Sequence, residues 1–275
     1  MSPEVLTGLD CSLPHGGGEG VRGVGTLATE IRMTGGHILQ VGTRTEVRHS
    51  PTPRRRRWSH YLVRPGVVEM IGRYGKDELV RGFLREDPGR PFDPGAVCEQ
   101  WMNLVQESVG LDRRAPFTAR RTRLRWVAAA ATGQETRRII FRMHRGGLRT
   151  VSLRAPADLL PRAPELFTDL ALHDWLLSSV VGLVERSGIG RRERESVLLR
   201  LAPAIDHLLH LWMPAARLDD RLREYWEALD QRCRLVQQWE GTVRQIRDQT
   251  LLRGIGTAPV APGSEARRGR AARFP

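Results

Sequence analysis

The sequence predicts an α+β fold, in which an antiparallel β-rich N-terminal region precedes a C-terminal three-helix bundle. Up to about residue 155, several stretches alternate apolar and polar side chains with a period of two, which is typical of strands with one buried face. From Ala163 onward the apolar period becomes 3.6, which is typical of amphipathic helices. The chain has 275 residues, 40% of them hydrophobic, so it can build a core and is not disordered as a whole.

These patterns divide the chain into a mixed β-rich domain at 1–155, a bundle at 163–252 and a basic tail at 254–275. The first predicted element is a β-hairpin, because strand-like alternation at 27–33 resumes at 39–47 after a Gly-Gly break. The tail is rich in Gly, Pro, Ala and Arg, and this composition predicts disorder.

A basic linker at 50–57, with the sequence SPTPRRRR, follows the hairpin. Its two prolines disfavour both a helix and a central strand. Two short helices are predicted next, at 65–73 and 77–85, and then a longer amphipathic helix at 96–109.

Strand-like alternation returns at 120–154 and predicts a three-stranded antiparallel meander with turns at 133–136 and 145–147. One face of this meander is apolar. The other is rich in arginine: Arg121, Arg123, Arg125, Arg138 and Arg142.

Three amphipathic helices with short connections predict an antiparallel bundle. The first begins near Pro164 and stops at Gly188. The second covers 191–212 with a kink expected at Pro203, and the third covers 217–252.

The formal net charge of +13 is concentrated in one part of the chain, because residues 51–155 carry twelve of the thirteen net charges and the bundle is almost neutral. Lys76 is the only lysine, and this preference for arginine is typical of a GC-rich genome. The excess of positive charge is not explained by codon usage, so it suggests an acidic partner for residues 51–155.

One hypothesis is therefore a surface for nucleic acid or another polyanion, because arginine side chains match phosphate geometry. This surface would combine the arginines of the meander with those of the linker, Arg54, Arg55, Arg56 and Arg57. Two alternatives remain open: a solvated strand face, or a face packed on acidic helices of a partner.

A metal site in the bundle is a weaker alternative. His173 and Asp174 are adjacent, and Asp206 and His210 are four residues apart on one helix face. Such pairs are found in metal-dependent HD phosphohydrolases, but the order of residues in that pattern is incomplete here. Histidines on leucine-rich helices more often form hydrogen bonds at the edge of a core, and three separated cysteines suggest neither a metal site nor a disulfide framework. We expect no cofactor.

Trp212 and Met213 lie at the predicted end of the second helix and are candidates for an exposed docking site. The sequence contains no apolar run long enough to span a membrane and no signal-peptide pattern. We therefore expect a cytoplasmic protein that does not insert into a membrane.

Four strings, VRGVGTLATEIRMTGGHILQ, WSHYLVRPGVVEMIGR, ALHDWLL and HLLHLWMP, resemble a family of uncharacterised actinomycete proteins. The resemblance covers most of the chain, but none of the strings is a catalytic motif. It implies a component of a multi-protein system and no catalytic residue. Together with the lack of a recognisable acid/base, nucleophile or cofactor pattern, it predicts an accessory or adaptor protein that docks on protein partners through its helical bundle and its arginine-rich β face. A polyanion-binding protein is the alternative, and a metal-dependent hydrolase is less favoured.

Overall fold

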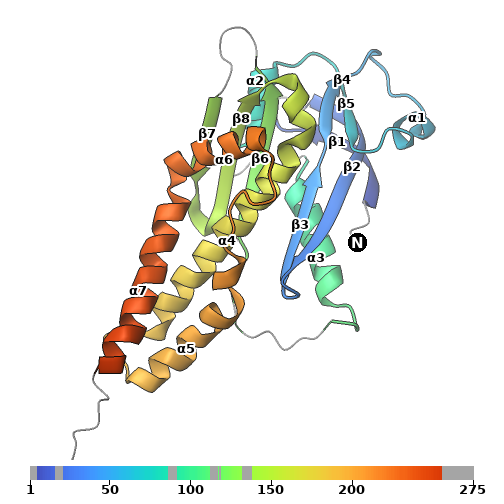
Figure 1. Cartoon of the computed structure of the whole chain (residues 1–275). Coiled ribbons are helices and arrows are strands. Elements are labelled where there is room, and N and C mark those ends of the chain that lie inside the picture. The colour runs from blue at the N-terminus through green and yellow to red at the C-terminus, as the bar shows by residue number, and fades with distance from the viewer. Residues whose placement is uncertain are drawn as a thin grey trace, which may run out of the picture.

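The computed structural model of the chain confirms the α+β class. It describes residues 5–15, 21–85, 92–111, 117, 119–131 and 138–255. Strands dominate the first 155 residues and long helices follow, so the strand-rich part and the helical part lie side by side (Figure 1). The predicted tail at 254–275 falls almost wholly outside the described residues.

Sheet A has five strands: β1 (Val5–Leu13), β2 (Val21–Thr34), β3 (Ile38–Arg44), β4 (Glu46–His49) and β5 (Val67–Ile71). β2 pairs antiparallel with β1, β3 and β5, whereas β4 and β5 run parallel. The predicted hairpin is confirmed as β2 and β3. Its turn contains Gly35 and Gly36, both with positive φ angles that glycine adopts without strain.

The predicted helix at 65–73 is wrong, because this stretch contains β5. Val68, Glu69 and Met70 are all buried, as in a strand covered on both faces. A short continuous apolar run of this kind looks the same in a buried helix and a buried strand. The helices around sheet A are α1 (Trp58–Leu62), α2 (Lys76–Phe83) and α3 (Pro94–Gln106), and the last two agree with the predicted helices at 77–85 and 96–109.

Sheet B contains the three strands predicted in the second β-region: β6 (Arg123–Ala130), β7 (Arg138–Met143) and β8 (Leu148–Ala155). Their order corrects the predicted meander. β8 is the middle strand, antiparallel to β7 and parallel to β6. β8 is also the most buried of the three strands, as expected for a strand that has a neighbouring strand on each side.

The helical part contains α4 (Ala163–Ser187), α5 (Arg194–His207), α6 (Asp220–Cys233) and α7 (Leu235–Ile255). α4 ends at Gly188 in a left-handed conformation, as predicted. The predicted third helix is wrong as a single element, because it breaks at Arg234. α7 runs along α4 and α5, whereas α6 packs against α4 and β7 (Figure 1). Short 3₁₀ turns at 145–147, 157–162 and 209–211 complete the elements.

Arg234 adopts a left-handed conformation with φ 53° and ψ 40°. This conformation costs a non-glycine residue about 1 kcal/mol, and the Arg234 side chain is exposed. We therefore expect Arg234→Gly to raise the free energy of unfolding by about 0.5–1 kcal/mol in urea denaturation. Arg232→Gly, inside the last turn of α6, should instead lower it by about 1 kcal/mol. Destabilisation by both substitutions would contradict this prediction.

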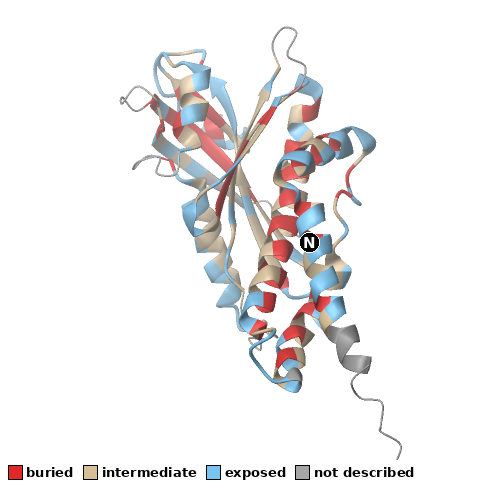
Figure 2. Cartoon of the chain, turned by 90° about the vertical axis from the view of Figure 1, so that its left-hand side faces the viewer, coloured by how far each residue is buried: buried red, intermediate tan, exposed pale blue. Residues whose placement is uncertain are grey.

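Two hydrophobic clusters hold the molecule together. The larger joins sheet B to the helices: Val151 and Leu153 of β8 pack with α4, and Ile38 of β3 also joins it. The smaller lies within the N-terminal part around β2, β5 and Phe92. Figure 2 shows buried residues along the helices and in the strands. Sheet B thus shares its core mainly with the helices, and Ile38 is the residue of sheet A that joins it.

In the described part of the chain, one helical stretch, 157–187, is long and apolar enough to cross a membrane. Of its most apolar window, 56% is buried inside the protein. This burial is typical of the core helix of a globular protein, and α4 does lie in the larger cluster.

Candidate anion-binding loop

The basic linker connects β4 to α1 at the outer edge of sheet A, and its four consecutive arginines, Arg54–Arg57, are called the arginine loop here. All four are exposed. Arg55 folds back: its Nη1 lies 2.9 Å from Asp10 Oδ2, and its guanidinium lies 4.3 Å from the centre of the Trp58 ring. Among the described residues, the guanidinium groups of Arg54, Arg56 and Arg57 have no acidic partner.

Asp10 also binds Arg22, whose Nη2 is 2.9 Å from Oδ2. The hydrogen bond from Arg22 lowers the pKa of Asp10 below its ordinary value, and the charge of Arg55 lowers it further against the opposing effect of desolvation. Asp10 is therefore ionised at neutral pH and satisfies one arginine of the loop. The other three keep their charge for solvent or a ligand.

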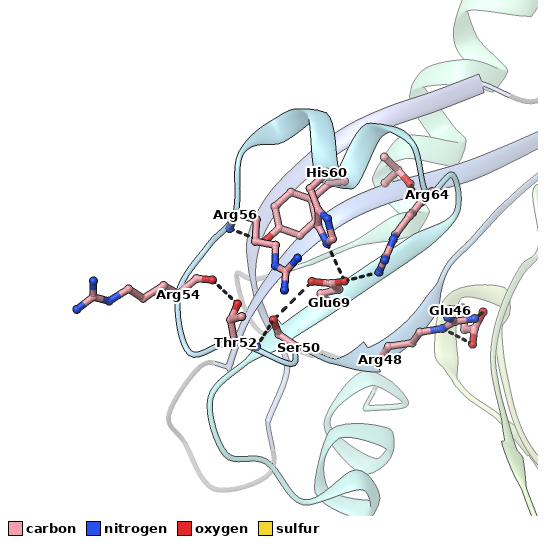
Figure 3. A network of polar contacts seen from close by, with 11 residues as sticks. Glu46, Arg48, Ser50, Thr52, Arg54, Arg56, His60, Arg64 and Glu69 are labelled. Carbon is pink, nitrogen blue, oxygen red and sulfur yellow. Dashed lines mark hydrogen bonds and ion pairs between the residues drawn. The ribbon is translucent and has the colours of Figure 1, made fainter.

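Hydrogen bonds fix the backbone of the arginine loop (Figure 3). The backbone N–H of Arg56 donates to the hydroxyl of Tyr61 at 2.9 Å, and Tyr61 is only 1% exposed. The hydroxyl of Thr52 donates to the carbonyl of Arg54 at 2.8 Å. A fixed backbone reduces the ordering that binding would otherwise require.

A buried carboxylate, Glu69 of β5, anchors both ends of the loop. It is 3% exposed and accepts hydrogen bonds from Arg64 Nη1 at 2.9 Å and His60 Nε2 at 3.2 Å. Ser50 Oγ lies 3.5 Å from its other oxygen. A buried carboxylate needs such partners because its desolvation is costly. Ser50 precedes the loop and His60 and Arg64 follow it, so Glu69 ties both sides to sheet A.

This network does not have the geometry of a nucleophile and its base. In a hydrolytic triad the imidazole lies between the hydroxyl and the carboxylate. Here the carboxylate of Glu69 lies between Ser50 and His60 (Figure 3). The arrangement positions a loop and does not activate the serine.

The arginines on β6 and just before it bind the N-terminal part of the same chain. Arg121 Nη2 donates to Asn103 Oδ1 at 3.0 Å and to Gln106 Oε1 at 2.7 Å, both on α3. Arg123 Nη2 is 2.6 Å from Glu99 Oε1, also on α3.

Two further arginines of sheet B continue this contact. Arg125 Nη1 donates to the carbonyl of Arg85 at 3.0 Å, and its Nη2 lies 3.7 Å from Asp93 Oδ1. Arg154 Nη2, on β8, binds Asp77 Oδ1 on α2 at 2.8 Å. Acidic and amide groups of α2, α3 and the turn before α3 therefore face the arginines of β6 and β8.

The structure does not bring the two predicted groups of arginines together. The arginine loop precedes α1 at the far edge of sheet A, whereas sheet B lies on the other side, against the helices (Figure 1). On β7, Arg138 and Arg142 are exposed. The predicted polyanion surface thus divides into the arginine loop and a strand face on which Arg121, Arg123 and Arg125 are paired with groups of the same chain.

The four predicted metal ligands lie in different environments: two are buried and two are exposed. His173 is buried, and its Nδ1 donates to the carbonyl of Asp169 at 2.8 Å. Asp174 is buried with Arg149, whose Nε is 3.1 Å from Asp174 Oδ1. Asp206 and His210 are exposed. Within the described residues, no group of three or more His, Cys, Asp or Glu side chains is arranged to hold a metal ion.

Trp212 belongs to an aromatic cluster, in which its ring stacks on Trp239 at 4.1 Å and meets the His173 ring edge-on at 5.0 Å. Met213 is 57% exposed. Of the two predicted docking residues, only the methionine offers an extensive free surface.

The three thiols are poor nucleophiles at neutral pH. Burial raises the pKa of Cys11 and of Cys233 to about 11, and it also raises the pKa of Cys98. A reactive cysteine needs a lowered pKa, since the thiolate is the attacking species.

No protein-family model, curated protein or solved structure matches the chain. The residues that anchor the arginine loop, Glu69, Ser50, Arg64 and Tyr61, are not among the predicted site residues. The sequence contains one indication of this anchoring network: Glu69 is the single charged residue in the apolar run VVEMI. A carboxylate in a buried strand requires cationic or hydrogen-bonding partners nearby.

Proposed function

We propose that the chain is a non-catalytic accessory or adaptor protein that binds an anionic partner through the arginine loop. The observation that carries this proposal is the exposure of Arg54, Arg56 and Arg57 without an acidic partner in the described part of the chain. Their backbone is already fixed by Tyr61 and Thr52. The expectation that the protein works in the cytoplasm is part of the same proposal.

A comparison with the arginines of sheet B supports assigning the anionic partner to the arginine loop. Arg121 and Arg123 would have to leave their partners on α3 before they could bind a ligand. Exchanging one ion pair for another gains little, because exposed pairs are worth only about 0–1 kcal/mol. Arg54, Arg56 and Arg57 would form charge-assisted hydrogen bonds without giving up an ion pair to any residue that the structure describes.

A salt titration on immobilised heparin, a sulfated polyanion, tests this proposal. Each anionic contact makes the logarithm of the binding constant fall with the logarithm of the salt concentration by about 0.9. The variant R54Q/R56Q/R57Q should therefore elute at clearly lower salt, with a slope smaller by about two to three.

The matched control removes the same charge elsewhere. Arg191 and Arg192 precede α5 and Arg200 lies within it; all three are exposed, and R191Q/R192Q/R200Q should elute close to the unmodified protein. Equal weakening by the two triple substitutions would mean that heparin responds to net charge alone, and the proposal would then fail.

A further inference from the structure

An apolar surface directly follows the arginine loop. Trp58, Leu62 and Val63 are 36%, 53% and 75% exposed. Leu62 is the last residue of α1 and Val63 caps the helix, so the two most exposed side chains lie together at its C-terminal end, while Trp58 begins the helix. Tyr61 of the same helix is instead buried and is 1% exposed.

This apolar surface and the charged loop form one projection. α1 packs against β2 of sheet A at the periphery of the molecule, far from α5 and α7 (Figure 1). Three guanidinium groups without an acidic partner among the described residues and three exposed apolar side chains thus occur within ten consecutive residues, 54–63.

We propose that the arginine loop and α1 bind the surface of an anionic lipid membrane, an inference that rests on the proposed function and specifies its partner. Arg54, Arg56 and Arg57 would bind lipid phosphates, while Leu62 and Val63 enter the boundary between headgroups and acyl chains. This is adsorption to the membrane surface and needs no spanning segment. The cytoplasmic leaflet is the one that carries anionic lipids.

A nucleic acid fits this surface less well. Phosphate contacts would satisfy the arginines but leave Leu62 and Val63 exposed to water. An aromatic ring could stack on a base, but Arg55 already lies over the Trp58 ring at 4.3 Å. The same ring also packs against β1 at Gly8, where a β-carbon would stand 3.5 Å from it.

The expected binding is weak and reversible. One basic side chain near an anionic surface strengthens binding roughly fivefold, so three should contribute about a hundredfold. The apolar face of α1 is short, and even a single acyl chain anchors a protein only marginally. Both the charged and the apolar component are therefore required.

Co-sedimentation of the full chain with vesicles tests the inference. Vesicles of phosphatidylcholine with phosphatidylserine should bind the protein at about 0.1 M salt, and vesicles of phosphatidylcholine alone should not. R54Q/R56Q/R57Q should reduce the partition coefficient about a hundredfold.

The apolar component has its own test. L62S/V63S should reduce the partition coefficient about tenfold, because it removes the buried aliphatic groups and keeps every charge. L104S/V109S replaces two side chains on and after α3 that are 56% and 99% exposed, and it should have no effect.

Each alternative outcome has a defined meaning. Heparin binding that depends on the arginine loop, without vesicle binding, would overturn the lipid inference and leave the proposed function standing. Vesicle binding that L62S/V63S does not weaken would overturn the role of α1. Loss of loop-dependent binding in both assays would overturn the proposed function as well.

Discussion

Replacing Arg149 with methionine should lower the free energy of unfolding by about 3–5 kcal/mol at neutral pH. Arg149 is 9% exposed, and its Nε lies 3.1 Å from Oδ1 of Asp174, which is 6% exposed. The substitution would leave a buried carboxylate without its counter-charge. Urea denaturation followed by tryptophan fluorescence measures the loss.

The pH dependence of this loss provides a second readout. Burial raises the pKa of Asp174 above its ordinary value, and Arg149 partly opposes this rise. Without Arg149 the pKa of Asp174 in the folded state rises further. A raised folded-state pKa means that stability is retained at low pH and lost as the pH rises through that pKa. The deficit of Arg149→Met should therefore shrink as the pH is lowered from 7 toward about 4.

A double substitution separates the buried charge from the loss of packing. R149M/D174L removes both charges, and replacement of a whole buried pair by apolar residues is often neutral. Its free energy of unfolding should lie within about 1 kcal/mol of the unmodified protein. If Arg149→Met costs less than about 1 kcal/mol, or the double variant is no better, the pair is not the buried unit described here.

Replacing Gly25 with alanine should cost about 3 kcal/mol. Gly25 of β2 lies opposite Val68 of β5 in the antiparallel pair. A β-carbon there would overlap the carbonyl oxygen of Val67 and stand 2.6 Å from the Cα of Val68. Both are backbone atoms, so the two strands must separate. Thermal denaturation by circular dichroism checks this loss.

Gly42→Ala is the matched control, because this glycine lies in β3 with no atom within 4 Å of a β-carbon. It should leave stability unchanged or slightly raised. The Gly25 substitution also displaces β5, which carries Glu69, so it should weaken the anchoring of the arginine loop. Equal stability of the two alanine variants would contradict the close approach of β2 and β5.

Local patterns predict much of the fold. The hairpin of β2 and β3 follows from alternation around two glycines, and the end of α4 follows from Gly188. Both features depend on residues that are close in sequence. Apolar periodicity identifies such elements because it reports burial, whatever covers the buried face.

Features that depend on distant packing are not predictable in this way. The run VVEMI forms a strand because β2 and β4 flank it. β8 takes the middle of sheet B because β6 and β7 both pair with it. The break between α6 and α7 falls at Arg234, which adopts a left-handed conformation. Because neither glycine nor proline stands there, the sequence does not predict the break.

The candidate site also has parts that the sequence predicts and parts that depend on distant packing. Four consecutive arginines predict an exposed basic segment from composition alone. The partners of the sheet B arginines do not follow from the sequence, since Glu99 and Arg123 are brought together only by the packing of α3. Several arginines of residues 51–155 thus pair with acidic and amide groups of the same region, and the arginine loop is one of the exposed basic segments that remain.

The most direct test compares the arginine loop with sheet B in one salt titration on heparin. R54Q/R56Q/R57Q and R121Q/R123Q/R142Q remove the same charge from the two predicted arginine groups. The loop variant should lose most of the affinity and reduce the salt slope by about two to three, while the sheet B variant changes the slope by less than about one. A larger loss in the sheet B variant would contradict the assignment of the anionic partner to the arginine loop.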